Sequence, residues 1–208
     1  MHKIKIVQFF SRENLLKINI LNKVIRFFII FGFLLAHNVK AEIGGDFVLE
    51  DYNNNKYHLY NSSKEKIIFF GFLNCPDICP STLSEVSNLL KKLRGLSKRI
   101  DPIFITVDPT RDKPDLMKNY LSFFDKRIIG LTGSQEQIEK VANQYHVYYS
   151  YQDKGKKNNY TVNHTANIYF LNKNNKIEKI FIPGTPFSEL YKYVNRYLMK
   201  EVKNLPLK

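Results

Sequence analysis

The chain has 208 residues, a length typical of one domain with a targeting segment in front of it. Hydrophobic residues make up 44% of the composition, which supplies one sizeable core. The formal net charge of +13 raises the class of nucleic-acid-binding proteins. After residue 41, however, the cations are scattered among Asn without a dense stripe. Nucleic-acid binding is therefore disfavoured, and we expect a solvated basic surface that helps to meet an acidic partner.

The first 41 residues have the layout of a targeting segment. Lys23 and Arg26 precede ten uncharged, mostly apolar residues, 27–36, and small residues around Lys40 offer a cleavage site. This layout is typical of a secretory signal peptide, because a membrane-spanning helix needs ~20 apolar residues. We expect a signal peptide or N-terminal anchor over 1–41 and an exported domain over 42–208. If the segment is an uncleaved anchor, the protein associates with the membrane through it.

The exported part alternates between strand-like and helical patterns. A hairpin comes first, over 46–61, and an apolar run at 66–72 then predicts a strand that is buried on both faces. The patterns that follow are a helix over 80–94, a strand over 102–108, a helix from Pro114, a strand over 127–133, a helix capped at Ser134, a hairpin over 164–184 and a helix from near Pro186.

This order predicts an α/β fold in which helices flank a mixed central sheet. A buried strand, a cysteine motif and a helix follow one another at 66–94, which is the order of a thioredoxin-like fold. The first hairpin adds an N-terminal β-hairpin to that fold.

Both cysteines of the chain, Cys75 and Cys79, lie in "FFGFLNCPDICPST". A disulfide between them would close so small a loop that it contributes only ~2 kcal/mol, which disfavours a purely structural bridge. The pair lies where a strand leads into a helix N-terminus, and the backbone N–H groups there favour thiolates and lower their pKa. Thiolates attack disulfides and also bind soft metals, so the pair leaves redox and metal chemistry open.

A third ligand would decide between these chemistries. Two of the five histidines, His2 and His37, lie in the leader. His58 in the first hairpin and His146 just past a helix read as surface or edge residues. His164 stands before an apolar strand, where thioredoxin-like folds bring the chain past the cysteine motif. Two thiolates and an imidazole suit copper, especially Cu(I), whereas zinc prefers a fourth ligand.

Three blocks of the sequence resemble the SCO/SenC copper chaperones of cytochrome c oxidase assembly. "FFGFLNCPDICPSTLSEV" contains the family's C-P-D-x-C-P segment, and "FITVDPTRDKPDLMKNY" resembles its V-D-P-x-R-D block. "YTVNHTANIYFLN" resembles the segment that carries the copper-binding histidine. The blocks occur in order, and the resemblance spans roughly residues 44–200.

The resemblance implies that Cys75, Cys79 and His164 bind copper as Cu(I), Cu(II) or both. Asp77, inside the motif, would shape the loop rather than bind the metal. The family commonly has Asp before the histidine, and this chain has Asn163. An Asn supplies no negative charge to the imidazole, so the tuning of copper affinity is in doubt.

The sequence around Asp108, Arg111 and Asp112 is typical of a structural turn with a helix cap. These residues belong to the V-D-P-x-R-D block. We therefore expect them to shape the fold rather than to contact the metal.

The function implied by the resemblance is that of a metallochaperone, not an enzyme, which passes copper to the binuclear copper site of cytochrome c oxidase. Its partner would be the copper-bearing oxidase subunit, with other copper or thiol-redox proteins as further candidates. The expected location is the bacterial periplasm or the outer face of the inner membrane, or the mitochondrial intermembrane space in a eukaryote.

The alternative is an exported thiol–disulfide oxidoreductase that keeps partner cysteines reduced, with Cys75 and Cys79 as its redox-active pair. A peroxidase ranks third. Peroxiredoxins carry a P-x-x-x-T-x-x-C motif, and "FFGFLNC" lacks its Pro and Thr.

Overall fold

The computed structural model describes residues 22–23, 25–26, 43–153 and 160–204. Residue contacts divide the chain into two compact units, Met1–Ala41 and Glu42–Lys208. The predicted leader or anchor falls almost entirely outside the described residues and stays a prediction. Among the residues that are described, no helix has the length and apolar character needed to span a bilayer.

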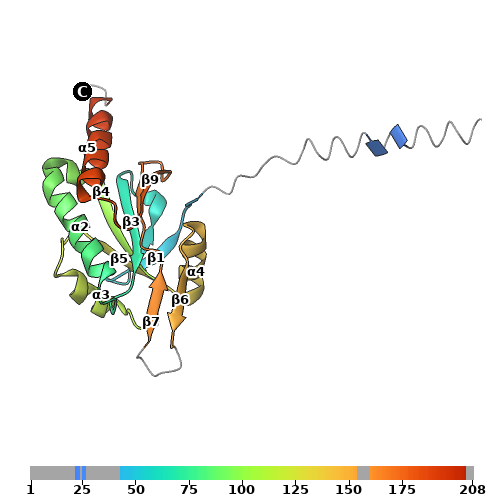
Figure 1. Cartoon of the computed structure of the whole chain (residues 1–208), viewed down its shortest axis with the longest axis horizontal. Coiled ribbons are helices and arrows are strands. Elements are labelled where there is room, and N and C mark those ends of the chain that lie inside the picture. Colours follow the sequence, from blue (N-terminus) through green and yellow to red (C-terminus); the bar gives the residue numbers. More distant parts are fainter. Residues whose placement is uncertain (1–21, 24, 27–42, 154–159, 205–208) are drawn as a thin grey trace, which may run out of the picture. The chain divides into compact units, whose positions relative to one another are not determined.

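The second unit is built on a mixed seven-stranded sheet (Figure 1). Its strand order is β2-β1-β5-β4-β3-β8-β9. The bounds are β1 Val48–Asp51, β2 Lys56–His58, β3 Glu65–Gly71, β4 Ile100–Thr106, β5 Ile129–Thr132, β8 Ile168–Leu171 and β9 Ile177–Phe181. Strands β3, β4 and β5 are parallel, whereas β8 runs antiparallel to both β3 and β9. This sheet confirms the expected thioredoxin-like α/β fold, and β1 and β2 form the expected N-terminal hairpin.

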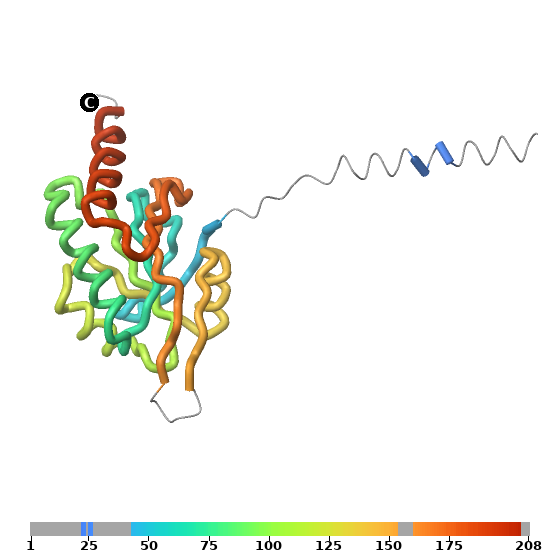
Figure 2. Tube along the Cα trace, viewed as in Figure 1, coloured from blue at the N-terminus to red at the C-terminus, as the bar shows by residue number. Residues whose placement is uncertain are grey.

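Helices cover both faces of the sheet. Helices α2, α3 and α5 pack on one face, and α4 packs on the other together with a separate two-stranded sheet of β6 and β7 (Figures 1 and 2). The bounds are η1 Leu59–Asn61, α2 Ile78–Leu93, η2 Arg94–Arg99, α3 Pro114–Leu121, α4 Gln135–Gln144, β6 Tyr149–Gln152, β7 Thr161–His164 and α5 Phe187–Lys203.

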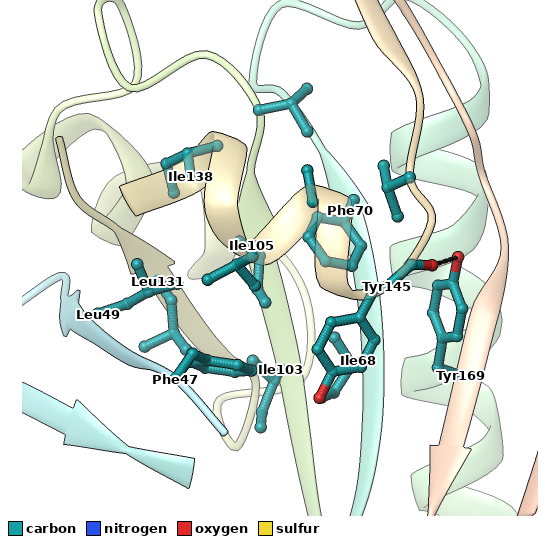
Figure 3. Close-up of a cluster of buried hydrophobic side chains, with 14 of the residues drawn as sticks. Phe47, Leu49, Ile68, Phe70, Ile103, Ile105, Leu131, Ile138, Tyr145 and Tyr169 are labelled. Carbon is teal, nitrogen blue, oxygen red and sulfur yellow. Dashed lines mark hydrogen bonds between the residues drawn. The ribbon is translucent and has the colours of Figure 1, made fainter. Parts of the chain in front are cut away.

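The core consists of two clusters, one on each face of the central sheet. On the α4 face, inward side chains of β1, β3, β4 and β5 pack against α4 and against Tyr145 and Tyr169 (Figure 3). The Tyr169 hydroxyl donates a hydrogen bond of 2.9 Å to the backbone carbonyl of Tyr145, so a buried polar group is satisfied there. On the other face, apolar residues of α2 and α5 recur at helical spacing and interdigitate: Leu83, Val86, Leu90, Leu93, Leu190, Val194 and Leu198.

The observed elements differ from the sequence expectation in two places that matter for the site. Helix α2 begins at Ile78, two residues earlier than the predicted start at residue 80, so Cys79 lies in its first turn. The sequence patterns predict no strands in residues 149–163, whereas β6 and most of β7 lie there. These strands were missed because their tyrosines and polar residues show only a weak alternation of burial.

We expect Gly130→Ala to destabilise the domain by about 1–3 kcal/mol, because α3 lies directly on β5 at this residue. A Cβ atom at Gly130 would overlap the side chains of Met117 and Leu121. Gly95→Ala is the matched control, since nothing lies within 4 Å of a Cβ atom there. Chemical denaturation measures both variants. Equal stability of the two would contradict the close packing of α3.

Candidate metal centre

The cysteine loop lies between the end of β3 and the start of α2. The Cys75 backbone N–H donates a hydrogen bond of 3.2 Å to the Phe72 carbonyl, which turns the chain toward the helix. Asp77 occupies the N-cap position of α2, where its side chain makes no capping hydrogen bond. A Cβ atom at Gly71 would lie 2.7 Å from the Cys79 sulfur, so only glycine lets this sulfur pack so close to β3.

His164 reaches the cysteines from the end of β7. Pairing of β7 with β6 sets its register, with His164 opposite Tyr149. The His164 Nε2 atom lies 3.4 Å from the Cys79 sulfur, and the Nδ1–H donates a hydrogen bond of 3.0 Å to the Thr165 carbonyl. Because a carbonyl only accepts, the Nδ1 atom carries the proton in the neutral ring, and Nε2 faces Cys79 with a lone pair.

The structure brings the three predicted site residues together. The two sulfurs and one imidazole nitrogen lie within 4.8 Å of one another. Within the described part of the chain, this is the one group of three or more His, Cys, Asp or Glu residues that could hold a metal ion. Cys79 is buried, Cys75 and His164 are partly exposed, and both cysteines are free rather than bridged. Two soft sulfurs and one nitrogen fit a copper ion.

Burial sets the protonation of the site in the absence of metal. Desolvation raises the pKa of the Cys79 thiol well above its ordinary value, although the Phe72 backbone N–H favours the thiolate. The expectation that a helix N-terminus lowers the thiol pKa is therefore wrong for Cys79, since desolvation outweighs the backbone N–H groups. Burial also lowers the pKa of His164, which keeps its imidazole neutral and able to bind a metal.

Asp112 connects the cysteine loop to the end of β4 by hydrogen bonds. Its Oδ2 atom accepts hydrogen bonds from the Leu73 backbone N–H at 3.0 Å and from the Thr106 hydroxyl at 2.6 Å. The carboxyl group is almost fully buried, and desolvation raises its pKa to about 6. One carboxylate thus joins the end of β4 to the residue that lies two positions before Cys75.

Asp108 and Arg111 hold the histidine hairpin in a similar way. The Arg111 Nε–H and the Tyr160 hydroxyl both donate to the buried Asp108 carboxylate, the latter at 2.8 Å. The Arg111 guanidinium also donates to the Tyr160 carbonyl at 2.7 Å and lies over the Tyr160 ring, 3.5 Å from its centre. Tyr160 directly precedes β7, which ends at His164.

These contacts define the role of the predicted structural turn. We call Asp108, Arg111 and Asp112 the clamp, because they join the cysteine loop to the histidine hairpin. The V-D-P-x-R-D block pointed to these residues, but the sequence carried no signal for their partners, Leu73 and Tyr160.

Asn163 lies on the opposite face of β7 from His164. Successive side chains of a strand alternate between faces, and Asn163 is exposed, whereas the neighbouring Val162 is buried. The group that orients the imidazole is the Thr165 carbonyl, which no sequence pattern indicated. His58 and His146, both exposed, lie outside the cluster as expected, and His2 and His37 lie outside the described residues.

Comparison with known proteins identifies the family. The SCO1/SenC family model matches residues 36–199. A SCO2-like protein of Rickettsia prowazekii is 37% identical over 161 residues, covering 74% of this chain and 77% of that protein. The mitochondrial protein SCO2 of Saccharomyces cerevisiae is 40% identical over 132 residues, covering 62% of this chain and 44% of that protein.

Solved structures agree with this result. The structure of Bradyrhizobium japonicum ScoI with copper bound has a TM-score of 0.68 and 38% identity, covering 74% of this chain and 99% of that one. Yeast Sco1 with copper bound has a TM-score of 0.68 and 32% identity, covering 79% of this chain and 91% of that one. The family match extends over most of the sequence and over the whole donor cluster, and the chain therefore belongs to the SCO1/SenC family.

Proposed function

We propose that this protein binds copper through Cys75, Cys79 and His164 and delivers it to the binuclear copper site of cytochrome c oxidase. The convergence of two sulfurs and a neutral imidazole nitrogen within 4.8 Å carries this proposal. Relatives with copper bound in the solved structures support the choice of metal.

Transfer to the partner would proceed by ligand exchange, one donor at a time. Cys75 is the less buried residue of the two and lies on the loop, whereas Cys79 is buried in the first turn of α2. A thiolate of the oxidase subunit would therefore replace Cys75 first and Cys79 later. Further copper or thiol-redox proteins could meet the same exposed donor.

The place of action would lie outside the cytoplasm. The N-terminal segment has the features of a signal peptide or anchor. Some relatives are named as mitochondrial proteins, and one solved relative is described as a lipoprotein. We infer a periplasmic location, or the intermembrane space in a eukaryote.

A thiol–disulfide oxidoreductase is the second candidate, because the same two thiols could reduce partner cysteines. Both cysteines are free, and residue Cys75 is partly exposed, which favours attack on a partner disulfide. The two functions differ in their need for His164. Exchange depends mainly on thiolate fraction and access, whereas the copper site needs its nitrogen.

Oxidation of Cys75 and Cys79 to a disulfide is expected to abolish Cu(I) binding, because a disulfide offers no thiolate. Titration of Cu(I) into protein of known redox state measures this, and re-reduction should restore binding. Unchanged affinity after complete oxidation would place the copper site elsewhere.

Removal of the imidazole in His164→Ala is expected to weaken Cu(II) binding by at least ~10–100-fold, since Cu(II) prefers more ligands, including nitrogen. Cu(I) binding should weaken less, because two sulfurs still hold it. Metal analysis under reducing conditions, Cu(II) absorption and oxidase maturation are the measurements. His146→Ala, at an exposed histidine, is the control. If Cu(II) affinity is the same in both variants, the oxidoreductase moves to first place.

Loss of the clamp is expected to act on the nitrogen rather than on the sulfurs. Arg111→Gln removes the donors to Asp108 and Tyr160, so His164 should be held less firmly and Cu(II) affinity should fall ~10-fold, while the thiols react as before. Arg127→Gln is the matched control, since Arg127 also pairs with a carboxylate, Asp125, at 2.6 Å. Equal Cu(II) affinity of the two variants would refute the role given to the clamp.

A further inference from the structure

The outward side of α5 and the last turns around the end of α2 carry a dense group of cations, which we call the basic face. Two adjoining surface depressions contain these residues, and they share Tyr191 and Asn195 in their linings. Of the residues that the structure describes, no Asp or Glu lines either depression. The seven exposed members are Lys91, Lys92, Arg94, Lys192, Arg196, Lys200 and Lys203.

This arrangement corrects the expectation of scattered charge. Residues 42–208 contain 25 Lys/Arg and 18 Asp/Glu, an excess of 7 cations. The basic face has 7 cations, so the other 18 cations of the domain are balanced by its 18 acids. Folding therefore gathers seven cations, without a lining acid from the described residues, on one face.

The basic face has an electrostatic cost within its own domain. Lys192, Arg196 and Lys200 follow one another at i,i+4 along α5, where like charges destabilise a helix. Among the described residues, none of the seven cations pairs with a carboxylate. Glu201 of the same helix pairs instead with Lys173, at 3.5 Å. The repulsion would be relieved by an anionic surface outside the domain.

Apolar side chains lie among the lysines at the end of α5. Met199 is 44% exposed and Val202 is 40% exposed, next to Lys200 and Lys203. Long lysine side chains reach outward past such residues, so their charges can meet lipid headgroups while the apolar groups enter the boundary below. Cations and apolar side chains together in the last turns of one helix are the composition of helices that lie at a bilayer surface.

The basic face and the metal centre lie at different ends of α2. Cys79 is in the first turn of α2 and Lys92 in its last, which separates them by roughly 20 Å along the helix. The ammonium group of Lys92 lies 4.3 Å from the ring centre of Tyr191, which joins this end of α2 to α5.

Contacts around the β8–β9 turn link the start of the domain to the end of α5. Gly44 lies against Ile177 at the start of β9, and Lys173 in the β8–β9 turn pairs with Glu201 in the last turn of α5. Gly44 therefore lies beside the strand pair whose turn is held to the last turn of α5.

We propose that the basic face binds the anionic surface of a phospholipid bilayer. Docked in this way, the domain would hold the end of α5 at the headgroups and keep Cys75 and His164 in the aqueous phase. The contact is electrostatic with a small apolar component, so it is reversible and weakens as salt is added.

The test uses residues 42–208, one compact unit that contains both core clusters. Cosedimentation is measured with vesicles of phosphatidylcholine containing phosphatidylglycerol, and with phosphatidylcholine alone. The face variant changes Lys192, Arg196, Lys200 and Lys203 to Gln. The control variant changes four other exposed lysines to Gln, with the same loss of net charge: Lys56, Lys126, Lys140 and Lys176.

The parent domain should bind the anionic vesicles and not the neutral ones. The face variant should lose at least about 10-fold in affinity, and the control variant should lose much less. Equal losses in the two variants would reduce the effect to net charge and overturn the proposal. Binding to polyglutamate, a mimic of an acidic protein, is measured in parallel. If the face variant loses binding to polyglutamate but keeps vesicle binding, the basic face binds an acidic protein and the proposal is overturned.

Orientation provides a second test, because the chain contains no Trp. Met199→Trp places a single reporter on the basic face. Ile182→Trp places a single reporter at the other end of α2: Ile182 is 66% exposed, directly follows β9 and lies beside Ile78, next to Cys79. Lipids brominated in their acyl chains should quench the first reporter and leave the second unchanged. Quenching of Trp at 182 alone would show that the opposite end faces the membrane and would overturn the proposal.

Discussion

The antiparallel pairing of β3 with β8 is the constraint on which the metal centre depends. Phe69 pairs with Ile168, so the end of β3 and the start of β8 lie at the same edge of the sheet. The cysteine loop follows β3, and His164 stands shortly before β8. Two segments that are 85 residues apart therefore meet, and Cys79 contacts His164 without any covalent link.

The hydrogen bonds of the clamp link segments that are distant in the sequence, a role that disulfides often have in exported proteins. Asp112 holds the loop before Cys75, and Asp108 with Arg111 holds Tyr160 at the start of β7. All three belong to the short connection after β4, the strand that runs beside β3. The clamp therefore fixes both ligand segments to the sheet while leaving both sulfurs free for chemistry.

The sequence predicted most of the fold, because buried strands and amphipathic helices are local patterns. The run at 66–72 and the spacing of Leu83, Val86 and Leu90 needed no knowledge of distant contacts. The pKa of Cys79 was predicted wrongly because desolvation depends on what packs around the sulfur. The basic face was missed for the same reason, since it forms only when the end of α2 and helix α5, far apart in the sequence, come together. The β6–β7 hairpin was missed because its residues alternate only weakly between the two faces.

Helix α2 carries residues of the metal centre at one end and residues of the basic face at the other. Its first turn supplies Cys79, and the strand before it positions that sulfur through a glycine that leaves no room for a side chain. Its last turn supplies Lys91 and Lys92 to the basic face. Because the helix is rigid, an orientation imposed on the cations is passed to the sulfur at the other end. A docked domain would therefore present its donors in a fixed direction relative to the membrane surface.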